Sequence, residues 1–168
     1  MLLNVFYLII FLLLWIRDRN KAYSMNIDNI KKKVYRLSRE EKQQIMAYLA
    51  NFMENRKEVV FAYVHGSFNE DIPLHDIDVG VYVSGIKKEE ASSYALEFSF
   101  MLGNTLKIRT DVRVMNFAPV SFAFHVVQGR LISEQDENAR VQFVENIVRR
   151  YLDIKPLIHK NIREAFAA

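Results

Sequence analysis

Two short apolar runs, rich in β-branched and aromatic side chains, lie on either side of a polar loop near the middle of the chain. The first covers residues 59–64, and the second covers residues 77–83 and ends at Ser84-Gly85. Runs of this length and composition are typical of buried β-strands. The centre of the chain is therefore predicted to form part of a β-sheet, with the polar loop at one end of both strands.

The loop between these runs carries the side chains best suited to chemistry. Gly66-Ser67 directly follows the first run, and Asp76 and Asp78 mark the start of the second. Glycine permits a tight turn, and the amides and hydroxyl at the end of a strand attract phosphate. Side chains two residues apart on a strand project from the same face, so the two carboxylates can converge on one hard cation. Oxygen ligands suit Mg²⁺, which shares its coordination shell with substrate phosphates.

Each half of this pattern is a weak signal by itself, because Gly-Ser also forms ordinary turns and Asp-x-Asp also occurs as a solvated strand start. A third feature strengthens it. Residues 106–116 alternate between apolar and charged side chains, which predicts another strand. Asp111 lies in its middle between apolar neighbours, where a carboxylate is costly unless it has a function or pairs with a cation. An ion pair with Arg109 or Arg113 is the structural alternative.

Helical patterns surround these strands. Ser38 and Glu41 form a capping box at the start of an apolar stripe that predicts a helix to about residue 53. The other expected elements are a helical pattern from Asp28 to Leu37, a helix over 88–102 stopped by Gly103-Asn104, a short helix over 119–127, a short strand over 130–134, and a long helix after Asp136 with a kink or break at Pro156. The predicted fold class is α/β (α+β), with a small mixed sheet of about four strands flanked by helices.

Length and composition limit the other possibilities. The 168 residues suffice for one domain with its own core, and 51% hydrophobic residues indicate a globular chain. Cysteine is absent, so disulfides and thiolate sites are excluded, and a reducing, cytoplasmic location is expected. The formal net charge of +3 permits nucleic-acid binding but does not indicate it.

The first sixteen residues are the compositional exception, because they are apolar and carry no charge. A bilayer span needs about 20 apolar residues, or roughly 17 at the shortest, so this run is marginal. Three explanations stay open. Residues 1–24 precede a true start at Met25, or they form a weak membrane anchor, or they form a helix packed on a partner. If the run inserts, the positive charges after it predict that the domain at 25–168 stays on the cytoplasmic side.

The order of a strand, Gly66-Ser67, Asp76-x-Asp78 on a second strand, a helix and Asp111 on a third strand resembles the nucleotidyltransferase superfamily related to DNA polymerase β. The small size and the segment RTDVRVMNFAPVSFAFHVVQGRLI resemble, more narrowly, the minimal nucleotidyltransferases (MNT proteins). These proteins often act as antitoxins beside HEPN-domain toxins. The resemblance covers residues 25–168.

The resemblance implies a role for each site residue. Gly66 and Ser67 would grip the triphosphate of a nucleotide, Asp76 and Asp78 would bind metal, and Asp111 would join the catalytic metal and help to deprotonate the attacking hydroxyl. Two Mg²⁺ ions are implied, with ATP as the donor substrate. The implied reaction moves AMP onto a hydroxyl of a protein partner, namely a tyrosine of a HEPN toxin. Family members of this size also pair, so a homodimer is a further expectation.

One stretch departs from the family pattern. Many members have an arginine and a glycine shortly after Gly-Ser, where this chain has residues 68–71, Phe-Asn-Glu-Asp. The two acidic residues would repel phosphate unless they point outward, and Lys107, Arg109 and Arg113 are the candidates to replace the missing cation. The alternative function is a binding module that neutralises its partner by contact. A small-molecule nucleotidyltransferase is less favoured because the chain has little room for a second substrate domain.

Overall fold

The computed structural model describes residues 33–166, and the compact unit described below begins at Tyr35. The apolar run at residues 1–16 lies outside the described residues. So does the proposed division between residues 24 and 25, which stays a prediction.

The helical pattern predicted before Ser38 begins outside the described residues, and its end is not helical. Tyr35 instead forms an isolated antiparallel bridge with Leu74. Its N–H donates to the Leu74 carbonyl at 2.8 Å, and the Leu74 N–H donates back at 3.0 Å. The prediction of a helix through Leu37 was therefore wrong, because the backbone there pairs with the loop that leads to Asp76.

The described elements alternate between helices and strands. In chain order they are α2 (Arg39–Glu54), β1 (Val59–His65), the short 3₁₀ helix η1 (Gly66–Asn69), β2 (Ile77–Val83), α3 (Ala91–Leu106), β3 (Thr110–Val114), α4 (Val120–Val127), β4 (Arg130–Glu134) and α5 (Glu137–Phe166). The capping box is confirmed at α2, where Ser38 Oγ accepts from the Glu41 N–H and the Glu41 carboxylate accepts from the Ser38 N–H.

Within the described residues the four strands form one mixed sheet in the order β3-β2-β1-β4. β1 pairs antiparallel with both β2 and β4, whereas β2 and β3 are parallel and are joined through α3. The predicted fold class, a small mixed sheet of about four strands flanked by helices, is confirmed.

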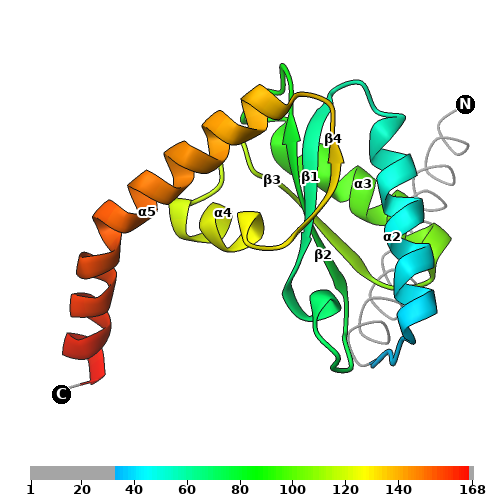
Figure 1. Ribbon diagram of the computed structural model, residues 1–168, viewed down its shortest axis with the longest axis horizontal. Helices are drawn as coiled ribbons and strands as arrows, with labels where there is room; N and C mark the ends of the chain where they lie inside the picture. Colours follow the sequence, from blue (N-terminus) through cyan, green and yellow to red (C-terminus); the bar gives the residue numbers. More distant parts are fainter. Residues whose placement is uncertain (1–32, 167–168) are drawn as a thin grey trace, which may run out of the picture. The chain divides into compact units, whose positions relative to one another are not determined.

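The helices cover both faces of the sheet (Figure 1). α2 and α3 lie on one face, and their Leu49, Met53, Phe98 and Leu102 join the larger apolar core. α4 and the first half of α5 lie on the other face, over a smaller core centred on Phe61. Side chains alternate along β2, so Val79 and Val81 belong to the first face, and Asp78, Gly80 and Tyr82 point to the second. The site residues thus lie on the side of α4.

The predicted bounds of α3 and β3 were wrong at both ends. α3 begins at Ala91 instead of residue 88 and continues through Gly103 and Asn104 to Leu106, and β3 covers Thr110–Val114 instead of 106–116. The stop is provided by Lys107, which adopts the left-handed conformation with φ of 56° and donates its N–H to the Gly103 carbonyl. Gly103 is not a cap, although a β-carbon there would lie 3.5 Å from the Ile108 carbonyl oxygen, in ordinary contact with the chain that leads to β3.

The last helix is one continuous element with Pro156 in its interior, so the proline does not break it. In Figure 1 the helix changes direction in its second half, as expected where a proline removes a backbone hydrogen bond. Among the described helices, none is both long and apolar enough to cross a bilayer.

Candidate active site

Three neighbouring strands bring His65, Asp78 and Asp111 into one row across the sheet. His65 is paired with Asp78 between β1 and β2, and Asp78 is paired with Asp111 between β2 and β3. Register partners on neighbouring strands project to the same face. The structure therefore brings together Asp78 and Asp111, which are far apart in sequence. The row lies at the end of the sheet where β1 gives way to η1.

Gly66 is in direct contact with this row. Its φ of +72° is in the left-handed region, and a β-carbon built on it would lie only 2.8 Å from Asp78 Oδ2. Any other residue would therefore strain the backbone and push the carboxylate away. Ser67 follows in the first turn of η1 and is half-buried. The Gly-Ser turn thus lies against Asp78, the second carboxylate of the Asp-x-Asp pair.

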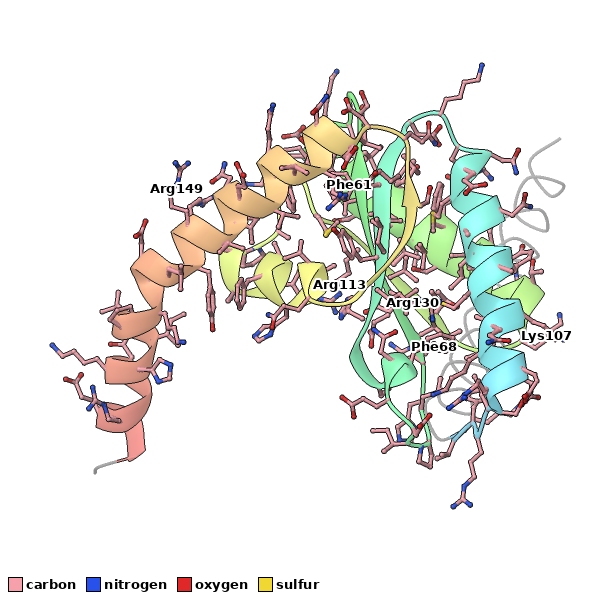
Figure 2. The ribbon with its side chains drawn as sticks, in the orientation of Figure 1. Phe61, Phe68, Lys107, Arg113, Arg130 and Arg149 are labelled. Atoms are coloured by element: carbon pink, nitrogen blue, oxygen red, sulfur yellow. The ribbon has the colours of Figure 1, made fainter. Side chains whose placement is uncertain are left out.

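Two arginines engage the other carboxylates. Arg109 lies 3.7 Å from Asp76, and Arg113 lies 3.1 Å from Asp111. The Arg113 guanidinium also stacks 5.3 Å above the Phe122 ring of α4, and Figure 2 shows this side chain extending from the sheet toward that helix. The ion pair of Asp111 with Arg113, which the sequence offered as the structural alternative, is therefore formed. The two arginines balance part of the negative charge of the site.

Asp78, the central carboxylate of the row, forms no ion pair with either arginine and has a raised pKa. Burial, together with the negative charges of Asp76 and Asp111, raises the pKa of Asp78 from its ordinary value of 3.8 to about 6. Asp76, Asp78 and Asp111 repel one another, so a bound cation would stabilise the site. Perturbed carboxylates of this kind are common where an acid, a base or a metal ligand is needed.

His65 completes the row on the β1 side of Asp78. Its ring is half-buried and packs edge to face against Phe122, with 5.7 Å between the ring centroids. Burial and the charge of Arg113 lower the pKa of the His65 imidazole, so the neutral form is favoured. Its place beside Asp78 follows from the antiparallel register of β1 and β2, which sequence spacing alone does not reveal.

The loop at residues 68–71, where many family members have an arginine, is held by contacts with other parts of the domain. Phe68 is buried in the larger core, and the Asn69 side chain donates to the Val64 carbonyl at 2.9 Å. Lys42 of α2 reaches this loop, where its ammonium donates to the Glu70 carbonyl and lies 3.8 Å from Asp71. The acidic side chains at 70 and 71 are exposed. Lys42 is therefore a cation that contacts this loop, whereas Arg109 pairs with Asp76 and Arg113 pairs with Asp111.

The carboxylates at the end of the sheet are candidate ligands for a divalent metal. Carboxylate oxygens that repel one another suit Mg²⁺ chemically. Among residues 33–166, however, no three carboxylate or imidazole groups converge closely enough to hold a metal ion. Asp76 and Asp111 are turned to arginines instead. The residues fit a magnesium site in type and in strand position, and metal binding would require Arg109 and Arg113 to release two of them.

A mixed sheet with a glycine-serine turn after one strand and carboxylates on the next two strands is the class of α/β domain that nucleotidyltransferases use. The family model described as "Polymerase beta, Nucleotidyltransferase" matches residues 47–138, which is more than half of the chain and contains all five predicted site residues. The chain belongs to this family. No curated protein matches the sequence.

Solved structures with this fold include MNT antitoxin complexes. A chain in the complex of a tri-AMPylated Shewanella oneidensis HEPN toxin with an MNT antitoxin is 15% identical, with a TM-score of 0.59 over 74% of this chain and 98% of that chain. A chain of the toxin–antitoxin MntA-HepT is 14% identical, with a TM-score of 0.58 over 73% and 97%. A chain of a toxin–antitoxin with AMP-PNP is 16% identical, with a TM-score of 0.56 over 72% and 97%. At these identities the similarity shows the fold.

Proposed function

We propose that this protein is a magnesium-dependent nucleotidyltransferase that moves AMP from ATP onto a hydroxyl group of a protein partner. The observation that carries the proposal is the contact between the Gly66 backbone and the Asp78 carboxylate, with Asp111 paired beside it on β3. This arrangement sets a phosphate-binding turn against a carboxylate cluster. Attack of a nucleotide α-phosphate by a hydroxyl needs these two features next to each other.

The reaction forms a phosphorus–oxygen bond to the acceptor hydroxyl and breaks the bond between the α- and β-phosphates, so that pyrophosphate leaves. Gly66 and Ser67 would bind the triphosphate through a backbone amide and the hydroxyl. Asp111 would take the proton of the attacking hydroxyl. Arg109 and Arg113, once released from Asp76 and Asp111, would be close enough to balance the charge of the phosphates.

Asp76, Asp78 and Asp111 are the residues that would hold Mg²⁺. When bound, the metal supplies neutralisation of the attacking and leaving oxygens. Burial raises the pKa of Asp78, and so do the charges of Asp76 and Asp111, so a cation bound beside these carboxylates would stabilise the charged form of Asp78.

The partner proposed is a HEPN-domain toxin. Two of the structural relatives are described as complexes or pairs of MNT or MntA antitoxins with HEPN or HepT toxins, and one of these toxins is tri-AMPylated. The fold shared with these chains supports an antitoxin role in which AMP transfer to a toxin tyrosine silences the toxin. ATP as the donor agrees with the relative that was solved with AMP-PNP.

A transfer assay tests the proposal. The purified protein is incubated with ATP labelled on the α-phosphate, Mg²⁺ and the product of the neighbouring gene, beside an Asp76→Asn/Asp78→Asn variant. We expect label on the partner with the wild-type protein and at least a hundredfold less with the variant, on the order of the loss seen when charge stabilisation is removed. Transfer that survives the double substitution would rule out the metal mechanism.

The second candidate is a binding module that neutralises its partner by contact alone. It is favoured by the two arginines on Asp76 and Asp111 and by the lack, within the described residues, of a converged metal-binding cluster. The same assay separates the candidates, because a contact inhibitor would block the toxin without label transfer. The Asp76→Asn/Asp78→Asn variant would then inhibit as well as the wild type.

A further inference from the structure

A groove of about 610 Å³ opens between α2, the η1 turn and the turn that joins α4 to β4. Its cations come from separate elements, with Arg39 and Lys42 on α2 and Arg130 at the start of β4. Asp71 is the acidic residue in the lining, and Phe68 contributes an apolar wall. Figure 2 shows Phe68 and Arg130 at the same end of the sheet. The groove is therefore a concave surface with an excess of positive charge.

Two of these cations are available to a ligand. Arg39 and Arg130 are both exposed, and neither forms an ion pair with another residue in the part of the chain that the structure describes. Arg39 is also the first residue of α2, where the helix macrodipole disfavours a cation. Guanidinium groups bind phosphate oxygens through pairs of parallel N–H donors. Two such groups that line one groove from separate elements suit a ligand with more than one phosphate.

Lys42 has a different role in the groove. Its side chain is only 16% exposed, and its ammonium lies on the Glu70 carbonyl, 3.8 Å from Asp71 and 5.8 Å from the centroid of the Phe68 ring. These contacts fasten the loop after η1 to α2. They also neutralise Asp71, so the carboxylate in the groove does not cancel the charge of Arg39 and Arg130.

The groove is adjacent to the carboxylate row. Gly66 touches Asp78 at one end of η1, and Asn69 lines the groove at the other end. Since a 3₁₀ helix rises about 2 Å per residue, these two ends are about 6 Å apart. On a second side, Gly129 of the groove packs so closely on His65 that a β-carbon would lie 2.9 Å from the His65 Cβ. A phosphate chain that starts at Asp78 thus passes Gly66 and Ser67 and continues toward the groove.

We infer that this groove binds the terminal phosphates of the donor nucleotide, with Arg39 and Arg130 as phosphate ligands and Lys42 as the residue that positions the loop. The inference rests on the proposed function. It accounts for the absence of an arginine at residues 68–71, because the cations for the leaving pyrophosphate come from α2 and β4. The carboxylate row would then hold the α-phosphate, at the near end of the same chain.

Calorimetric binding with the full-length chain in Mg²⁺ tests the groove. The ligands are ATP, AMP and inorganic tripolyphosphate, and the proteins are wild type, Arg39→Gln/Arg130→Gln and the matched control Arg149→Gln/Arg150→Gln, which removes two exposed arginines from α5. We expect the groove variant to bind ATP and tripolyphosphate about tenfold more weakly, because charge-assisted hydrogen bonds are lost. AMP affinity stays within about twofold, and the control resembles wild type for all three ligands.

Each other outcome has a defined meaning. Equal weakening of ATP and AMP, or equal binding of tripolyphosphate by the two arginine variants, would overturn the groove as a phosphate site. Weaker tripolyphosphate binding with unchanged ATP binding would show that the groove takes free phosphates and not the donor nucleotide. If wild type binds tripolyphosphate in the groove but transfers no label to a partner, the proposed function fails and the phosphate site stands.

The positioning role of Lys42 has its own readout. Lys42→Met should speed hydrogen exchange of the amides at residues 66–71 and raise the KM for ATP more than it lowers kcat, whereas Lys42→Arg keeps a donor and should restore both. Unchanged amide exchange in Lys42→Met would show that this ammonium does not hold the loop.

Discussion

The two faces of the sheet are built in different ways. The face under α2 and α3 is mainly apolar, with Val79, Val81, Phe98 and Leu102 fully or nearly fully buried. The face under α4 has a small aromatic and methionine core at one end and a row of charged groups at the other. The face under α2 and α3 thus stabilises the fold by apolar packing. The face under α4 has a smaller apolar core, and ionisable groups lie at its edge.

This difference teaches how the chain combines a stable fold with a repulsive site. Alternation along β2 sends every second side chain to each face, so the strand contributes Val79 and Val81 to one core without moving Asp78 from the other. Substitutions on the first face should therefore change stability most. Substitutions in the carboxylate row should remove function at little cost in stability, or even with a gain.

The largest effect is expected for Phe98→Ala on the first face. Phe98 is 2% exposed and packs edge to face on Phe52, 5.4 Å away. Its loss should lower the free energy of unfolding by about 3–5 kcal/mol, because a cavity remains. Urea unfolding followed by circular dichroism measures the change. Phe100→Ala on the same helix is the matched control, since Phe100 is 56% exposed and its loss should have little effect. If Phe98→Ala and Phe100→Ala lowered the free energy of unfolding equally, the apolar core on the first face would not be the source of stability.

A smaller effect is expected for Gly80→Ala on the second face. The added β-carbon would lie 2.4 Å from Val126 and 3.1 Å from the Met115 sulfur, and both neighbours are buried. Overpacking of this kind should lower the free energy of unfolding by about 1–3 kcal/mol. The double variant Gly80→Ala/Val126→Ala should lose less stability than the sum of the two single changes. Simple additivity would show that α4 does not pack against β2 at this glycine.

The stability of the protein should depend on pH through Asp78. The pKa of Asp78 is raised from 3.8 to about 6, so folding favours its protonated form. Its contribution to stability is present below pH about 4 and is lost as the pH rises through about 6.

Asp78→Asn mimics the protonated group and should be more stable than wild type at pH 7.5 by about 1 kcal/mol. This value is reduced for solvent screening because the carboxyl group is only half-buried. Urea midpoints without metal at pH 4 and 7.5 measure the difference, which should vanish at pH 4. A variant less stable than wild type at pH 7.5 would mean that Asp78 is stabilised as an anion.

The sequence predicted much of the fold because its periodicities are local. The strands at 59–65, 77–83 and 130–134 and the capping box at Ser38 follow directly from alternation and end signals. The end of α3 was missed because Lys107, and not glycine, adopts the left-handed conformation there. The pairing of Asp78 with His65 and Asp111 depends on strand register, and the reach of Lys42 to Glu70 depends on how α2 packs. Neither has a signal in sequence spacing, so the sequence predicted the carboxylates and the pairing of Asp111 with Arg113 but not the place of His65 or the role of Lys42.

The smallest effect is expected where neither face is involved. Lys160 and Glu164 lie one turn apart on α5 with 3.8 Å between their charged atoms, and both side chains are 65% exposed. Lys160→Ala should lower the free energy of unfolding by less than about 0.5 kcal/mol, because water and salt screen an exposed pair. The same urea titration, repeated in 1 M NaCl, should show no difference from wild type. If Lys160→Ala lowered the free energy of unfolding as much as Gly80→Ala, the distal half of α5 would contribute to stability beyond its surface charges. Stability would then depend on this half of α5 as well as on the two faces of the sheet.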